Sequence, residues 1–340
     1  MRRLPHELPG ERNRSRAGCR LRSTGGQLDV VEEWQTLPDG SVRDDEYRLR
    51  HADGTLRHFA GREIVFARCA DGRVQRILGL LLDITDRKAA HEALRDLVRA
   101  REAAKGDQLR ARHRLGKFLL RHGRRPSQNI KAWTQRHLDW IRQEVKFDQF
   151  AQQATLEDYL AEVDHLGQRI VRLEKAIDEA VDGAPETMKA VVSALQALRG
   201  VAKMTAVTIV AEVGQLSRFP KARQLMGYSG MVSSEDSSGE RTRRGAITKT
   251  GNAHLRRVLV EAAWCQRYKP TLSRVLRARQ EGLPAAVVEI AAKARHRLSA
   301  RYRRLLARGK PKQQVVTAIA RELLGFVWAI GVEVERKAVA

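Results

Sequence analysis

Residues 198–264 read LRGVAKMTAVTIVAEVGQLSRFPKARQLMGYSGMVSSEDSSGERTRRGAITKTGNAHLRRVLVEAAW, and the fold expected for the C-terminal half follows mainly from this segment. An apolar helix turns through LRGVAK and re-enters a second helix near Met204, which is a helix-hairpin-helix pattern. Backbone N–H groups at the start of such a second helix, together with the helix dipole, favour a phosphate. The alternative is a hairpin that only packs, and Ala202 favours it because most such hairpins carry a second glycine there.

The loop after this hairpin is rich in serine and is followed at once by cations. SSEDSSG occupies residues 233–239, and six Lys and Arg side chains follow between residues 241 and 257. A serine that attacks a phosphate needs its proton removed and the developing negative charge stabilised, and the guanidinium fork suits the second task. A serine in a Ser/Gly loop is also a common turn residue. The pattern predicts chemistry on a nucleic-acid backbone.

A second basic segment begins another helix. Its expected apolar face is Leu255, Val258, Leu259 and Ala262, and its polar residues fit contacts to a DNA backbone. The alternative is a solvated basic face. The predicted DNA-binding residues of the whole stretch are Gly200, Lys203, Thr205, Arg241, Arg243, Arg244, Lys249, Asn252, His254, Arg256 and Arg257.

Three segments of this stretch resemble the C-terminal domain of the transposases of insertion-sequence family 110. They read GVAKMTAVTIVAEVG, RFPKARQLMGYSGMVSSEDSSG and RRGAITKTGNAHLRRVLVEAAW, in this order. The resemblance extends over roughly residues 91–334 and is an argument by analogy. It implies DNA transposition by serine-dependent phosphoryl transfer. Ser238 is the implied nucleophile that links to a cleaved DNA end, and Ser237 is the second candidate.

The resemblance also implies partners and a missing part. Transposases of this family bind a structured guide RNA besides DNA, and they carry a resolvase-like domain whose four acidic residues bind divalent metal. No part of residues 1–90 resembles that domain. We therefore expect no cofactor in this chain and a transposase that is catalytically incomplete on its own. The alternative is a non-catalytic DNA-binding fusion or remnant protein.

Composition agrees with a polyanion partner. Lys and Arg number 64 against 40 Asp and Glu in 340 residues, a formal net charge of +24. Such an excess predicts nucleic-acid binding, although an Arg-rich genome produces a similar bias. The three cysteines lie far apart and form no metal-ligand pattern, and free thiols predict a cytoplasmic protein. No apolar leader or 18-residue apolar run is present, so no membrane association is expected.

The N-terminal part has a different character. Residues 1–26 are rich in Arg, Gly and Ser and predict a disordered basic tail. EYRLRH, TLRHFAGREIVFARC and RVQRILGLLLDIT follow, joined by Asp53-Gly54 and Asp71-Gly72, and predict three strands with tight turns. This pattern resembles the second half of a PAS domain, so residues 27–90 are expected to form a partial PAS domain. A half-sheet cannot enclose a ligand cavity, which disfavours a working sensor.

Residues 91–185 predict a helical linker. Within it, Leu156, Val163, Ile170 and Ile177 recur every seven residues, which is typical of a two-stranded coiled coil and predicts a homo-oligomer through residues 156–181. An amphipathic helix folded on its own chain explains the repeat equally well.

Two further helices are expected after Pro270, with Gly309-Lys310-Pro311 as the break between them, and the second is apolar nearly all round and must be buried. The expected fold is mainly α: a helix-hairpin-helix transposase domain at 186–340 with a long helical linker, preceded by a small partial β-sheet of PAS type.

Overall fold

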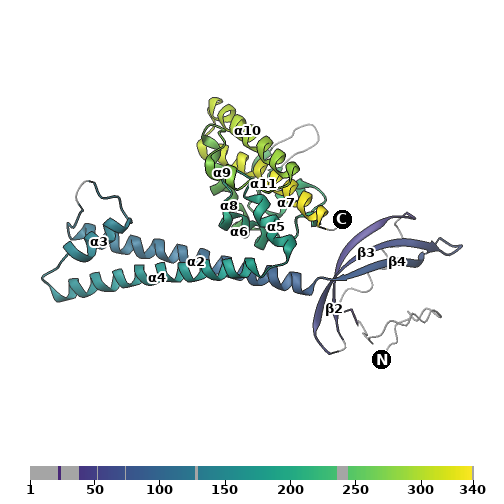
Figure 1. Ribbon diagram of the computed structural model, residues 1–340, viewed down its shortest axis with the longest axis horizontal. Coiled ribbons are helices and arrows are strands. Elements are labelled where there is room, and N and C mark those ends of the chain that lie inside the picture. Colours follow the sequence, from purple (N-terminus) through teal and green to yellow (C-terminus); the bar gives the residue numbers. More distant parts are fainter. Residues whose placement is uncertain are drawn as a thin grey trace. The chain divides into compact units, whose positions relative to one another are not determined.

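This computed structural model describes residues 22–23, 38–51, 53–72, 74–126, 129–235 and 244–338. The chain divides into two compact units, Met1–Lys88 and Ala89–Ala340. The first contains a sheet and the second is helical apart from one short pair of strands (Figure 1).

The first unit is an antiparallel sheet in the order β1-β2-β3-β4. Its strands are β1 (Arg22–Ser23), β2 (Val42–Arg50), β3 (Leu56–Arg68) and β4 (Val74–Asp83). Gly54 and Gly72 have φ of 86° and 82°, so both Asp-Gly turns use the backbone region open to glycine. The three predicted strands and their turns are confirmed. Part of the predicted tail differs, because Arg22–Ser23 pairs with β2, while the rest of residues 1–26 lies outside the described residues.

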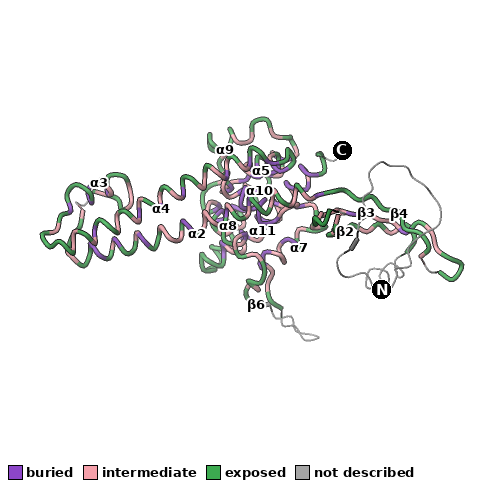
Figure 2. The backbone as a smooth tube through the Cα atoms, turned by 90° about the horizontal axis from the view of Figure 1, so that it is seen from below, coloured by how far each residue is buried: buried purple, intermediate pink, exposed green. Residues whose placement is uncertain are grey.

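Three helices build the predicted linker: α2 (Thr85–Arg121), α3 (Gln135–Glu144) and α4 (Phe150–Asp182). Figure 1 and Figure 2 both show α2 and α4 side by side. Leu115 and Phe118 of α2 share an apolar cluster with Leu156 and Val163 of α4. Ion pairs flank this contact, among them Arg101 Nη2 to Glu174 Oε1 at 2.6 Å.

The heptad positions of α4 are therefore filled from within the chain. Leu156, Val163, Ile170 and Ile177 are all buried, and Ile177 belongs to a second cluster that includes Leu94 of α2. This is the second of the two arrangements that the repeat allowed. A dimer through the same side chains would first have to separate α4 from α2.

The remaining helices, apart from α9, contribute to a single apolar core. In chain order, the remaining helices are α5 (Glu186–Leu195), α6 (Lys203–Val213), η1 (Leu216–Arg218), α7 (Ala222–Tyr228), α8 (Ala253–Ala263), η2 (Trp264–Arg267), α9 (Arg274–Ala278), α10 (Ala285–Ala307) and α11 (Lys312–Lys337). Helix α11 contacts α5, α7, α8 and α10. It is long and apolar enough to cross a membrane by composition alone, yet its apolar side chains, such as Leu323 and Leu324, form the centre of this core. The predicted burial of this helix is confirmed.

Candidate functional site

Two short antiparallel strands flank residues 236–243. β5 (Ser233–Glu235) pairs with β6 (Arg244–Ile247), and Figure 2 shows β6 projecting from the helical core. The connecting segment, residues 236–243, is outside the described residues, as is the side chain of Arg244. The predicted residues Ser237, Ser238, Arg241 and Arg243 fall within this segment. The sequence predicted a loop over residues 233–239, whereas Ser233–Glu235 form a strand, and the partner strand Arg244–Ile247 was not predicted.

The base of this β5–β6 hairpin is held by close backbone contacts. Gly230 has φ of 66°, and a Cβ there would lie 1.9 Å from the carbonyl oxygen of Thr250. Gly251 has φ of 89°, and its Cβ would lie 2.2 Å from the carbonyl oxygen of Tyr228. The Asn252 N–H donates to the same Tyr228 oxygen at 2.9 Å. Only glycine allows the two chain segments to approach this closely.

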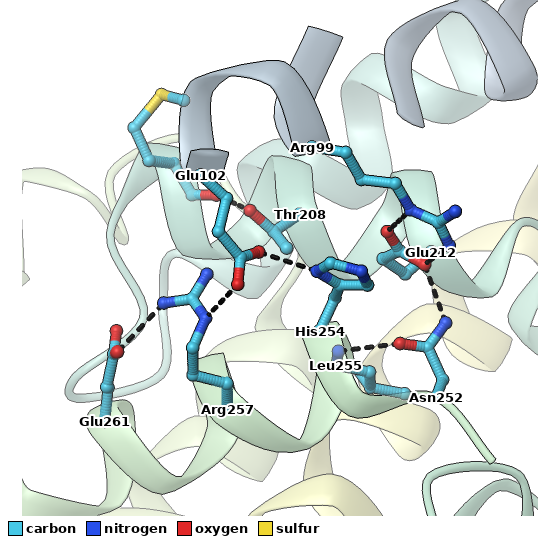
Figure 3. Close-up of polar contacts among 10 residues, drawn as sticks. Arg99, Glu102, Thr208, Glu212, Asn252, His254, Leu255, Arg257 and Glu261 are labelled. Atoms are coloured by element: carbon cyan, nitrogen blue, oxygen red, sulfur yellow. Dashed lines mark hydrogen bonds and ion pairs between the residues drawn. The ribbon is translucent and has the colours of Figure 1, made fainter. Parts of the chain in front are cut away.

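Glu212 ties three helices to this base. Its side chain is 0% exposed at the end of α6, and Arg99 of α2 donates to both carboxylate oxygens at 2.8 and 2.9 Å (Figure 3). Asn252 donates from Nδ2 to Glu212 Oε2 at 2.6 Å, and the Tyr228 hydroxyl donates to the Glu212 carbonyl oxygen at 2.9 Å. Because α2, α7 and α8 all reach one buried residue, Glu212 holds the helices that carry the hairpin.

The hydrogen-bond partners of Glu212 stabilise the ionised form of its carboxyl group. Burial alone would raise the pKa of this carboxyl, but the hydrogen bonds from Arg99 and Asn252 outweigh burial and hold the pKa below its usual value. A bidentate guanidinium is the partner that best compensates the desolvation of a buried carboxylate. The carboxylate is therefore ionised at neutral pH and serves as an anchor for the framework.

A second carboxylate, that of Glu102 in α2, contacts the basic face of α8. Glu102 Oε2 lies 2.7 Å from His254 Nδ1, and Arg257 donates from Nε to Glu102 Oε1 at 2.7 Å (Figure 3). Arg257 also donates to Glu261 Oε1 at 2.9 Å. Burial opposes ionisation of Glu102, yet the hydrogen bonds from Arg257 and His254 lower its pKa overall. These contacts join α2 to α8 next to Glu212.

The structure thus brings four predicted DNA-binding residues together, with partners inside the chain. Asn252 caps α8 by accepting the Leu255 N–H at Oδ1, 2.9 Å away, besides binding Glu212. Arg256 donates to the Ser229 carbonyl oxygen at 2.8 Å. His254 and Arg257 bind Glu102. All four have structural roles that the sequence pattern of basic residues did not reveal.

Sequence reasoning missed the acidic side of this framework. Glu212 is a lone charge within the apolar run TAVTIVAEV, and a buried carboxylate in such a run requires a cationic partner. That signal could have marked Glu212. The partner could not be identified, because Arg99 lies 113 residues away in the sequence.

The predicted hairpin turn lies at the opposite end of α6. Gly200 has φ of 88°, and a Cβ there would lie 2.3 Å from the carbonyl oxygen of Ala262 in α8. Lys203 Nζ pairs with Asp178 Oδ1 at 2.6 Å, and Thr205 is half-buried. Gly200 therefore allows α8 to pack against the turn, which agrees with the packing alternative for this glycine.

Lys249 differs from the other cations of the predicted set. It has φ of 58°, its backbone N–H donates to the Gly230 carbonyl oxygen at 3.0 Å, and its side chain is exposed. Among the described residues, the Lys249 side chain has no hydrogen-bond or ion-pair partner. It lines a groove whose other walls are α10 and α11.

Part of this framework lies in a segment that is similar to a known family. Residues 192–276 match the family described as Transposase IS116/IS110/IS902 family. The matched segment runs from α5 to α9 and includes the β5–β6 hairpin and Glu212.

Several named proteins are similar to this chain. A putative transposase y4qE of Sinorhizobium fredii is 46% identical over 244 residues, which are 72% of this chain and 58% of that protein. The transposase for insertion sequence element IS1533 of Leptospira borgpetersenii is 33% identical over 221 residues, 64% of this chain and 63% of that protein. The transposase for insertion sequence element IS1111A of Coxiella burnetii is 36% identical over 92 residues, 25% of each chain. The chain thus spans about three fifths of the length of the first two relatives.

Proposed function

We propose that this chain acts on DNA as an insertion-sequence transposase, by serine-dependent phosphoryl transfer at the segment between β5 and β6. The observation that carries the proposal is the family match over residues 192–276, which contains the hairpin and most of its polar framework. Similarity to three proteins named as transposases supports the same function. Ser238, the proposed nucleophile, and Ser237 lie outside the described residues, so their roles rest on sequence resemblance.

The proposed reaction exchanges one phosphate ester for another. The serine Oγ bonds to the phosphorus of a DNA phosphodiester while the bond from phosphorus to one sugar oxygen breaks. The serine gives its proton to a base, and the departing sugar oxygen takes up a proton. Cations near the phosphate would stabilise the charge that develops on its other oxygens, and Arg241, Arg243 and Arg244 are proposed for that role. The framework around Glu212 supports this by fixing the base of the hairpin.

We also propose divalent metal and guide RNA as partners in the reaction. Within the described part of the chain, no group of three or more His, Cys, Asp or Glu side chains could hold a metal ion. We propose that a resolvase-like domain supplies the carboxylates that bind divalent metal. The expected guide RNA and cytoplasmic location remain proposals of the same kind. The expected homo-oligomer through residues 156–181 also remains a proposal, and it would require α4 to separate from α2.

We also propose three structural assignments: a PAS-type sheet, a helix-hairpin-helix and a coiled coil. The antiparallel strands and Asp-Gly turns of the first unit support a PAS-type sheet. The turn at Gly200 between α5 and α6 supports a helix-hairpin-helix. The seven-residue repeat of α4 supports the predicted coiled coil, although the repeat packs on α2 of the same chain. None of these assignments is needed for the proposed reaction.

A donor-plasmid assay with guide RNA tests the proposal. The full chain is compared with Ser238→Ala, and with Ser237→Ala as the matched control, each with and without a separate resolvase-like domain. We expect joined DNA product only when that domain is added, and we expect Ser238→Ala to abolish it while Ser237→Ala retains it.

Three other outcomes of this assay would change the proposal. Joined product from the chain alone that is abolished in Ser238→Ala would show that the chain is a complete enzyme. Product that survives both substitutions would refute the serine mechanism. Salt-dependent DNA binding without product in any arm would favour the non-catalytic DNA-binding alternative.

A further inference from the structure

An open groove of about 930 Å³ runs beside the β5–β6 hairpin. One wall is formed by the two strands of the hairpin and Lys249, and the other by α10, α11 and the turn between them. None of the groove residues on α10 and α11 was singled out by the sequence pattern. The cationic side chains that line the groove are Lys249, Arg297, Arg301, Lys310 and Arg321.

The charge of the groove is unbalanced. Glu322 is the one acidic side chain among the described residues of its lining, and it is already paired with two of the cations. Arg297 donates to Glu322 Oε1, and Arg301 Nε lies 3.1 Å from Glu322 Oε2. In the part of the chain that the structure describes, the side chains of Lys249, Lys310 and Arg321 have no acidic partner. The groove therefore presents an excess of positive charge to an incoming ligand.

The other lining residues indicate which ligand fits. Ser233, Gln313 and Gln314 add hydroxyl and amide groups, which bind phosphate oxygens together with Lys and Arg in complexes with DNA. The described lining contains no Phe, Tyr, Trp or His. Proteins that bind single strands stack bases on such rings, so this groove is suited to a backbone whose bases are paired elsewhere.

We propose that this groove binds the phosphate backbone of duplex DNA alongside the β5–β6 hairpin. The inference rests on the proposed function, because it names the surface that would hold the DNA next to the reacting segment. The main DNA contacts would then be made by α10, α11 and Lys249. His254 and Arg257, which were predicted to bind DNA, bind Glu102 instead.

The test compares two double variants that remove the same charge. Lys310→Gln with Arg321→Gln removes two unpaired cations of the groove. Arg303→Gln with Arg336→Gln removes two exposed cations of α10 and α11 that do not line it. Each full-length protein is titrated with labelled duplex DNA of mixed sequence over a series of KCl concentrations, after circular dichroism has shown that it folds as the parent does.

We expect the groove variant to bind duplex DNA roughly tenfold more weakly than the parent, and the control to stay within about twofold. The slope of log K against log[salt] should become shallower by about 0.9 for each DNA phosphate that the variant no longer neutralises, or roughly 1.8 for the pair. The same titrations with single-stranded DNA and duplex RNA should show weaker binding that depends less on the groove.

The possible failures are distinguishable. Equal weakening in the two variants would overturn the groove, because net charge alone would then explain binding, while the proposed function would stand. If the affinity of the parent protein for DNA does not depend on salt concentration, both the DNA binding assumed in the proposed function and the proposed groove would be contradicted. A groove effect seen with RNA or single-stranded DNA and not with duplex DNA would overturn the assignment of the ligand.

Discussion

Strand β4 and helix α11 are both rich in apolar residues, yet the chain buries only the helix. Every residue of β4 from Gln75 to Asp83 is exposed, and Leu80 is 73% exposed. In α11, Leu323 and Leu324 are fully buried among α5, α7, α8 and α10. The difference shows that an apolar run acquires a core only where other elements of the chain can cover it.

The same contrast holds for the two units as wholes. Among the described residues of the first unit, Val65 and Ile84 are the only apolar side chains that are buried. The second unit joins most of its helices in one continuous cluster. Since burial of apolar area is the main stabilising contribution to folding, we expect the helical unit to hold most of the stability of the chain. An exposed apolar sheet adds little stability and favours association.

The largest expected effect separates two leucines. Leu259→Ala removes a fully buried side chain of α8 and should lower the free energy of unfolding of the helical unit by about 3 kcal/mol. Leu80→Ala in β4 should change stability by less than about 0.5 kcal/mol. Hydrogen exchange read by mass spectrometry under mild denaturant resolves the two units. Equal effects would show that β4 is covered in solution and that the two apolar segments do not differ in burial.

A smaller effect separates two glutamates. Glu212→Gln should destabilise the helical unit by about 2 kcal/mol, because Arg99 and Asn252 both face its buried carboxylate. Glu46→Gln is the matched variant in the sheet. Glu46 pairs with Lys88 at 2.6 Å with both side chains partly exposed, so its removal should cost less than about 1 kcal/mol. Urea unfolding followed by hydrogen exchange measures both, and a larger effect of Glu46→Gln would contradict the assigned role of Glu212.

The two units should also respond differently to pH. The pKa values of Glu212 and Glu102 are lowered in the folded chain, so the unfolded chain takes up protons first as the pH falls below about 4.5 and the helical unit loses stability. In the sheet, burial and the hydrogen bond to Glu63 raise the pKa of the Tyr47 hydroxyl above its ordinary value of 10.0. The stability that Tyr47 contributes is present below pH 10 and is lost as the pH rises further.

Thermal unfolding across this pH range, with hydrogen exchange to assign each transition, checks the prediction. Tyr47→Phe should flatten the alkaline response of the sheet, and Glu212→Gln should flatten the acid response of the helical unit. Acid sensitivity that is unchanged in Glu212→Gln would show that other carboxylates govern it.

The smallest expected change in stability comes from Leu80→Lys. A charge at this exposed position should alter the free energy of unfolding by less than about 0.5 kcal/mol, while reducing association of the chain through β4. Light scattering over a range of protein concentrations measures the association. A destabilisation of several kcal/mol would mean that another segment covers this face of the sheet.

Features set by neighbouring residues could be predicted from the sequence. The Asp-Gly turns were predicted because a tight turn needs the positive φ that Gly54 and Gly72 adopt. The break at Gly309-Lys310-Pro311 and the apolar face of α8 were predicted for similar local reasons. In the candidate site, the approximate start of α8 was predicted, and Asn252 is its cap.

Other features depend on residues far apart in the chain. The repeat of Leu156, Val163, Ile170 and Ile177 was compatible with a partner chain or with α2, and only the packed structure distinguishes them. The ion pairs of Glu212 with Arg99 and of Glu102 with Arg257 join residues 113 and 155 positions apart. Through such contacts, residues predicted to bind DNA, such as Arg257 and Asn252, bind carboxylates of the same chain instead.

The residue pattern was enough to predict the long helices, the three strands of the first unit, the basic charge and the resemblance in residues 198–264, because spacing and residue type act locally. The packed fold was needed to show which cations are already paired and which, such as Lys310 and Arg321, face a groove without an acidic partner among the described residues. Pairing depends on distances between side chains that the fold brings together. A count of charges along the chain contains no such distances.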